Sequence, residues 1–140
     1  MIQRIQTLWL LFASALAFAS LKIPFFSGNI MVDNLKQFQR FTGMSNMFLM
    51  ILTVAVGIGS LISVFLYKDR KTQLRIITGV LVVSVLTIIL YFLQTKIFVP
   101  TDWSLQLTSI VVLAIPVFLI MALRGINKDE KLMKSLDRLR

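Results

Sequence analysis

Two apolar runs decide the fold of this 140-residue chain. They read MSNMFLMILTVAVGIGSLISVFLY at residues 44–67 and IITGVLVVSVLTIILYF at residues 76–92. Neither run contains Asp, Glu, Lys, Arg or His, and the basic connector KDRKTQLR joins them at residues 68–75. A run of about 18 or more apolar residues can cross the ~30 Å hydrocarbon core of a bilayer. The stretch therefore predicts a transmembrane hairpin whose connector faces the cytoplasm.

The composition places the whole chain among integral membrane proteins. Hydrophobic residues make up 57% of it and charged residues only 15%, whereas soluble domains average about 25% charged residues. The chain has no Cys and no His, which excludes disulfides, thiol chemistry and the commonest haem, metal and proton-shuttle ligand. We expect no cofactor, no metal and no catalytic residue.

Two further spans flank the hairpin. Residues 1–4 and the apolar stretch after them resemble a secretory signal peptide, with an Ala17-Phe18-Ala19 triplet of the cleavable type. Because the apolar character continues to Phe26, we instead predict a retained helix. The predicted fold is an all-α antiparallel bundle of four transmembrane helices at about 5–26, 44–67, 74–93 and 105–123, so that residues 1–123 form one transmembrane domain.

The connection at residues 27–43 allows two interpretations. Leu35, Phe38 and Phe41 are three residues apart, with basic and amide residues between them. This spacing is typical of a short amphipathic turn lying on the bilayer surface, or of a loop packed over the helix ends.

Residues 124–140 form a basic tail. Asn127 is placed to cap a short amphipathic helix, with Glu130 reaching back to the cap and pairing with Lys134. That helix would lie on the inner membrane surface or cover the ends of the bundle. Five basic side chains fit acidic lipid headgroups or a cytoplasmic partner: Lys128, Lys131, Lys134, Arg138 and Arg140.

The distribution of charge predicts the orientation. Eleven of the 15 Lys and Arg residues fall in the termini and the 68–75 connector, which are cytoplasmic if both termini are inside. This distribution favours insertion as the explanation of the net charge of +9, with a specific acidic partner as the alternative. The tail has no aromatic residue for base stacking, so we expect no specific nucleic-acid partner.

Small residues mark where helices pack closely, because lipid provides no hydrophobic drive between spanning helices. The first predicted helix carries such a stripe and the second carries two, which suggests neighbours or a partner on those faces: Ala13 and Ala17, Gly57 and Ser60, Gly59 and Ser63.

A polar stripe of Ser84, Thr87 and Tyr91 follows one face of the third predicted helix. It could line a path for substrate or water. The alternative is hydrogen bonding between helices, or from each hydroxyl to the carbonyl one turn back.

The two ends of the chain carry a family resemblance. MIQRIQTL at residues 1–8 and RGINKDEKLMKSLDRLR at residues 124–140 resemble the small four-span membrane proteins of Bacteroidota catalogued as domain-of-unknown-function family 4293. The resemblance implies a bacterial inner-membrane protein and brings no activity, substrate or catalytic residue.

These observations favour a non-catalytic role. The predicted spans contain no carboxylate, His or Cys to serve an enzyme, and so no acidic residue to balance a transported cation. We therefore expect an uncharacterised multi-pass inner-membrane protein that is an accessory, assembly or scaffolding subunit of a larger membrane protein complex. The alternative is a small oligomeric transporter or channel for an uncharged or lipid-like substrate.

Overall fold

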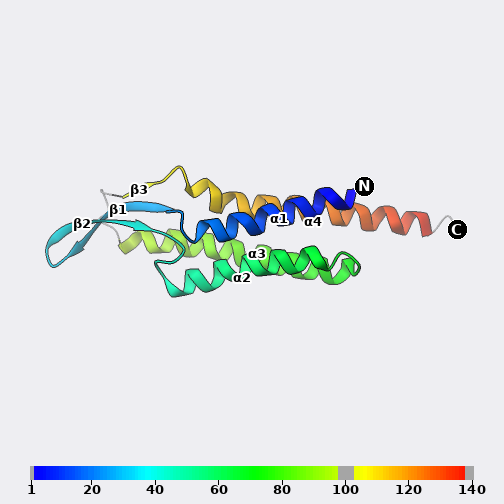
Figure 1. Ribbon diagram of the computed structural model, residues 1–140, viewed down its shortest axis with the longest axis horizontal. Coiled ribbons are helices and arrows are strands. Elements are labelled where there is room, and N and C mark those ends of the chain that lie inside the picture. The colour runs from blue at the N-terminus through cyan, green and yellow to red at the C-terminus, as the bar shows by residue number, and fades with distance from the viewer. Residues whose placement is uncertain (1, 98–102, 138–140) are drawn as a thin grey trace.

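Four helices run alternately up and down in an elongated bundle (Figure 1). The computed structural model describes residues 2–97 and 103–137. Its helices are α1 (Ile2–Ser20), α2 (Met47–Phe65), α3 (Arg70–Gln94) and α4 (Ser109–Asp137), with a 3-10 turn at Thr95–Ile97 after α3. Packing follows a ring, α1 against α2, α2 against α3, α3 against α4 and α4 against α1. The helical part of the predicted fold is confirmed.

Three of the helices are long and apolar enough to cross a membrane: α2, α3 and residues 109–135 of α4. The apolar part of α1 is shorter, at Ile5–Ser20. The helix ends at Ser20 and not at residue 26 as predicted, because Pro24 cannot continue a helix and Phe26 already begins a strand.

Side-chain caps fix where α2 and α3 begin. The Asn46 side chain accepts a hydrogen bond from the Phe48 backbone N–H at 2.9 Å. The Asp69 carboxylate accepts from the Thr72 N–H at 3.3 Å and from its hydroxyl at 2.7 Å. These bonds from Thr72 hold the pKa of Asp69 below its ordinary value of 3.8. The cap starts α3 at Arg70, four residues before the predicted start.

A small antiparallel sheet replaces the turn or loop predicted at residues 27–43. Strands β1 (Phe26–Val32) and β2 (Leu35–Phe41) form a hairpin, and β3 (Trp103–Leu105) pairs with the other edge of β1 near its start. Asp33 and Asn34 make the turn with φ of 51° and 62°. Both values are typical of a type I′ turn, whose twist suits a two-residue hairpin. The chain is therefore mostly helical and not purely so.

The predicted break between a fourth span and a separate tail helix is absent. Helix α4 runs without interruption through Pro116, Arg124 and Gly125. Asn127 is inside this helix, so its predicted role as an N-cap is wrong. Gly125 has a packing role instead, since a Cβ there would lie 2.8 Å from Cγ of Gln6 on α1.

Two apolar clusters form the core. One runs along the bundle and includes Leu10, Ile77 and Leu119, each fully buried. The other lies where the bundle meets the sheet and is mainly aromatic: the Phe25 ring stacks on Tyr91 at 4.5 Å and meets Phe26 edge-on at 4.6 Å. The second cluster fixes the base of the hairpin to the helices.

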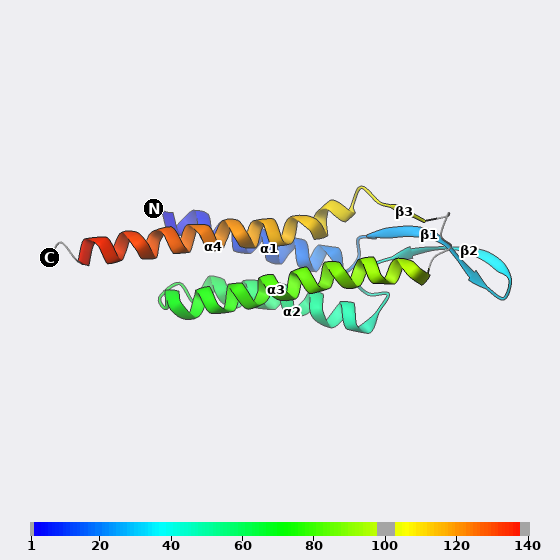
Figure 2. The ribbon, with the colours of Figure 1, turned by 180° about the vertical axis from the view of Figure 1, so that it is seen from behind.

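The two ends of the bundle differ in content. The N-terminus, the turn between α2 and α3 and the last part of α4 lie at one end, which we call the tail end (Figure 1). The sheet lies at the opposite end, the sheet end, and the tip of its hairpin extends beyond all four helices (Figures 1 and 2).

Candidate functional site

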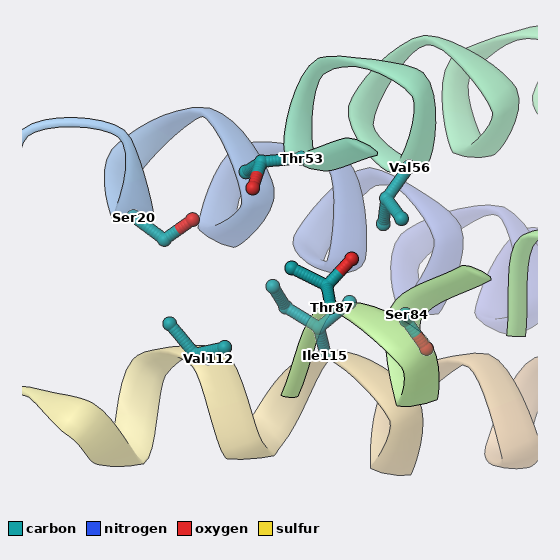
Figure 3. Close-up of a pocket in the computed structure, with 7 residues that line it drawn as sticks. All are labelled: Ser20, Thr53, Val56, Ser84, Thr87, Val112 and Ile115. Carbon is teal, nitrogen blue, oxygen red and sulfur yellow. The ribbon is translucent and has the colours of Figure 1, made fainter. Parts of the chain in front are cut away.

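The predicted polar stripe faces the interior of the bundle. Ser84 and Thr87 are buried, and their hydroxyls donate to the Leu81 and Val83 carbonyls of their own helix at 2.7 and 2.8 Å. They line a cavity of about 10 Å³, whose other walls come from the remaining three helices (Figure 3): Ser20, Thr53, Val56, Val112 and Ile115. A space of this size holds about one water molecule.

Tyr91, the third member of the stripe, belongs to the aromatic cluster at the sheet end. Its ring is fully buried, and its hydroxyl has no hydrogen-bond partner of good geometry among the described residues. A Cβ on Gly43 would lie 3.0 Å from that hydroxyl. Tyr91 thus packs the α3 end against the strand that returns to α2.

The small residues of α1 and α2 are used for packing within the chain. Ala13 and Ala17 are fully buried. A Cβ on Gly57 would lie 2.9 Å from the Phe18 ring of α1, and one on Gly59 would lie 2.5 Å from Cγ2 of Val80 on α3. One small face of α2 therefore receives α1, and the other receives α3.

Hydroxyls support the same contacts. The Ser14 hydroxyl of α1 donates to the Gly57 carbonyl at 3.1 Å. Ser60 and Ser63 are buried and donate to the Val56 and Gly59 carbonyls of their own helix, each at 2.8 Å. The faces of α2 that carry Gly57 and Gly59 are therefore occupied by α1 and α3 within the chain.

A buried polar cluster at the tail end was not predicted. The Gln6 side-chain amide of α1 donates to the Asp129 carboxylate of α4 at 2.6 Å, and Asp129 is only 8% exposed. Gln73 of α3 donates to the Ser63 carbonyl of α2 at 2.8 Å. These two side-chain hydrogen bonds connect α1 to α4 and α3 to α2 at the tail end.

Arg70 completes this polar cluster. One of its guanidinium nitrogens is buried without a hydrogen-bond partner among the described residues. It borders a second cavity of about 10 Å³, again large enough for about one water. The other lining residues are Gln6, Thr7, Tyr67, Gln73, Ile126 and Asp129.

The sequence did carry a signal for Asp129. The buried face of α4 continues at alternating spacings of three and four residues and reaches Asp129 in register: Val112, Ile115, Leu119, Ala122, Ile126 and Asp129. The separate helix predicted at residues 124–140 hid this register.

The tail residues lie on the surface. Lys128, Lys131 and Lys134 are exposed, and Lys134 pairs with Glu130 at 2.8 Å as its spacing predicted. Arg138 and Arg140 lie outside the described residues. Across residues 2–97 and 103–137, no group of three or more His, Cys, Asp or Glu residues gathers that could hold a metal ion.

The hairpin tip exposes large apolar side chains. Met31, Leu35 and Phe38 are 62%, 67% and 65% exposed. The register places Met31 opposite Lys36 and Phe38 opposite Asn29. In the sheet order β2-β1-β3, the outer edge of β2 has no neighbouring strand among the described residues.

The fold and these sites define a small, mostly helical protein whose apolar helices are typical of membrane proteins. It has a buried polar cluster at the tail end and a projecting hairpin at the sheet end. Comparison with protein families finds a match to the Domain of unknown function (DUF4293) over residues 2–139. The chain belongs to this family. Comparisons with curated proteins and with solved structures find no match.

Proposed function

We propose that this chain is a non-catalytic accessory subunit of a bacterial inner-membrane protein complex, and that it docks on its partner through the β1–β2 hairpin. All four helices span the bilayer in this proposal, and both termini are cytoplasmic. Support comes from the gathering of both chain ends and the 68–75 connector at the tail end (Figure 1), since those segments hold most of the Lys and Arg residues.

The single observation that carries the docking role is the exposed apolar hairpin tip. It projects past the helices along the axis of the bundle (Figures 1 and 2), so spanning helices would hold it on the outer side, in water. Monomeric proteins rarely leave contiguous large apolar side chains in water, and such patches mark interaction sites. The tip carries four such side chains, Met31 and Phe38 on one face of the hairpin and Val32 and Leu35 on the other, and we call them together the tip patch.

The edge of β2 suggests how a partner binds. An open strand edge offers a row of backbone N–H and C=O groups to another strand, and adding a strand is a common mode of recognition. Antiparallel pairing of two copies about Phe38 would place Lys36 of each copy opposite Arg40 of the other. Like charges directly opposite destabilise a strand pair. The partner strand we propose therefore carries acidic residues opposite Lys36 and Arg40.

The interior of the bundle gives less support to transport. The hydroxyl cavity of about 10 Å³ accommodates a water molecule and not a substrate. A transporter assembled from this chain would need its path elsewhere, between copies. That the chain is not an enzyme stays a prediction from its composition.

Site-specific photo-crosslinking in native membranes tests the docking role. We expect a cross-linker at position 38 to capture a protein with an acidic extracytoplasmic strand. The double change Lys36→Glu and Arg40→Glu should abolish the product. The control is a cross-linker at Leu107, which is 94% exposed at the same end but outside the hairpin. Equal products from positions 38 and 107, or a product unaffected by the charge reversal, would overturn the proposal.

A further inference from the structure

A shallow groove lies between α3 and α4 near the tail end and is open to the outside. Its volume is about 430 Å³, compared with about 10 Å³ for each interior cavity. Helix α3 contributes Leu74, Arg75 and Thr78, and α4 contributes Leu123 and Asn127. The two helices pack along each other here (Figure 2), and the groove opens to the outside of the bundle.

The groove contains two side chains, Arg75 and Asn127, whose N–H groups can donate hydrogen bonds to a ligand. Arg75 and Asn127 are exposed, and neither side chain makes a hydrogen bond or ion pair with another of the described residues. Arg75 also lowers the pKa of Asp69, but as the weakest of the causes, and the Asp69 carboxylate is already bonded to Thr72. A guanidinium presents its N–H groups in a fork that matches a phosphate.

Thr78 is the third polar residue of the groove, and its hydroxyl hydrogen is already used within α3. The Thr78 hydroxyl donates to the Leu74 carbonyl at 2.8 Å. Thr78 therefore presents its methyl group and an acceptor oxygen to the groove. Positive charge and amide donors come only from the side of Arg75 and Asn127.

The surroundings change from cationic to apolar along the helix axes. One turn toward the tail end, the same faces carry Lys71 on α3 and Lys131 on α4, both exposed. One to two turns the other way they carry Gly79, Val82 and Ile120. A Cβ on Gly79 would meet nothing within 4 Å, so the surface of α3 is open at Gly79.

We propose that this groove binds one anionic glycerophospholipid, with its phosphate at Arg75 and Asn127 and an acyl chain along the apolar part of α3 and α4. Charge and shape both fit this occupant. Lys71 and Lys131 flank the headgroup, and the chain runs toward the membrane interior past Gly79. Basic pockets between spanning helices on the cytoplasmic side suit such headgroups. The inference needs the helices to lie in a bilayer with the tail end inside, but it is independent of hairpin docking.

Native mass spectrometry of the full-length, delipidated protein in mild detergent tests the site. The probes are phosphatidylglycerol and phosphatidylcholine of equal chain length. We expect one phosphatidylglycerol to bind at least severalfold more tightly than phosphatidylcholine. Arg75→Gln should weaken phosphatidylglycerol binding about tenfold, as expected when a charge-assisted hydrogen bond is lost.

Two further variants separate charge from shape. Thr78→Trp keeps every charge but fills the groove, so it should weaken binding of both lipids. Arg40→Gln removes the same charge at the sheet end and should leave binding unchanged. Phosphatidylglycerol binding by Arg75→Gln equal to that of Arg40→Gln would overturn the proposal.

Free phosphate is the competing occupant. Inorganic phosphate and glycerol 3-phosphate at millimolar concentration should not displace the lipid, because they lack the acyl chain. Full displacement by either would assign the groove to a small phosphate compound and refute the lipid site. Phe38→Ser should bind lipid as the wild type does, so failure of the docking role leaves this result unaffected.

Discussion

The tail end of this bundle buries polar side chains, whereas the sheet end exposes apolar ones. At the tail end, polar side chains are drawn inside and paired, as Gln6 is with Asp129 and Gln73 with the Ser63 carbonyl. At the sheet end, apolar side chains such as Leu35 and Phe38 are left outside, beside an open strand edge. A polar group buried without a partner is costly, and so is a large apolar surface left in water. At the tail end, Gln6 and Gln73 find their partners within the chain, whereas at the sheet end the exposed apolar side chains would be covered by the partner that we propose.

The largest expected effect comes from removing the carboxylate at the tail end. Asp129→Leu leaves the buried Gln6 amide without its partner and should lower the free energy of unfolding by about 1–3 kcal/mol. Chemical unfolding in detergent micelles measures the change. The control is the double variant Gln6→Leu with Asp129→Leu, which removes both partners and should recover most of the loss. Two losses that simply add would show that the hydrogen bond does not couple α1 to α4.

The hairpin turn should give the next largest effect. Asn34 has φ of 62°, which costs a β-branched side chain about 1–2 kcal/mol. Asn34→Val should therefore speed amide hydrogen exchange across β1 and β2 and leave the helices unchanged, while Asn34→Gly should preserve protection. Loss of protection in α2 or α3 would mean that the sheet end is not a separate unit.

A smaller effect is expected from the tip patch itself. Replacing Leu35 and Phe38 with Gln should change the free energy of unfolding by less than about 0.5 kcal/mol, because exposed side chains contribute little to the fold. The same unfolding measurement as for Asp129 applies. A loss as large as that of Asp129→Leu would show that the patch belongs to the core of the chain and not to an interface.

The smallest effect should come from the exposed cap of α3. The folded pKa of Asp69 is lowered below 3.8. Its contribution to stability is therefore present above about pH 4 and is lost as the pH falls through the folded pKa. Asp69→Asn keeps a capping side chain and should remove this pH dependence with little change at neutral pH. Unfolding curves of both proteins between pH 2 and pH 7 that remain parallel would contradict the assignment.

Apolar length was enough to predict four helices, but not where α1 and α4 end. The runs at residues 44–67 and 76–92 became α2 and α3, because a stretch without charges must satisfy its own backbone in lipid and a helix does so locally. The hairpin was missed because Leu35, Phe38 and Phe41 recur every three residues, as in a helical turn. Strand pairing depends on partners that are distant in sequence, such as Ser104 opposite Ser27.

The sites at the tail end were missed for a related reason. The predicted break before residue 124 falls beside Gly125, yet Gly125 lies inside α4, where a Cβ would lie 2.8 Å from Cγ of Gln6. Composition cannot distinguish a glycine that stops a helix from one that lets another helix approach. Once a break was assumed there, Asp129 was assigned to a surface tail and its place on the buried stripe of α4 went unseen.

The unbroken course of α4 has a mechanical consequence. At 1.5 Å per residue, its 29 residues make a rod about 44 Å long, well over the ~30 Å of hydrocarbon in a bilayer. A continuous helix such as α4 transmits a movement of one end to the other, whereas a flexible linker does not. With α4 spanning the bilayer as proposed, a molecule that binds its protruding stretch would therefore also move the spanning segment.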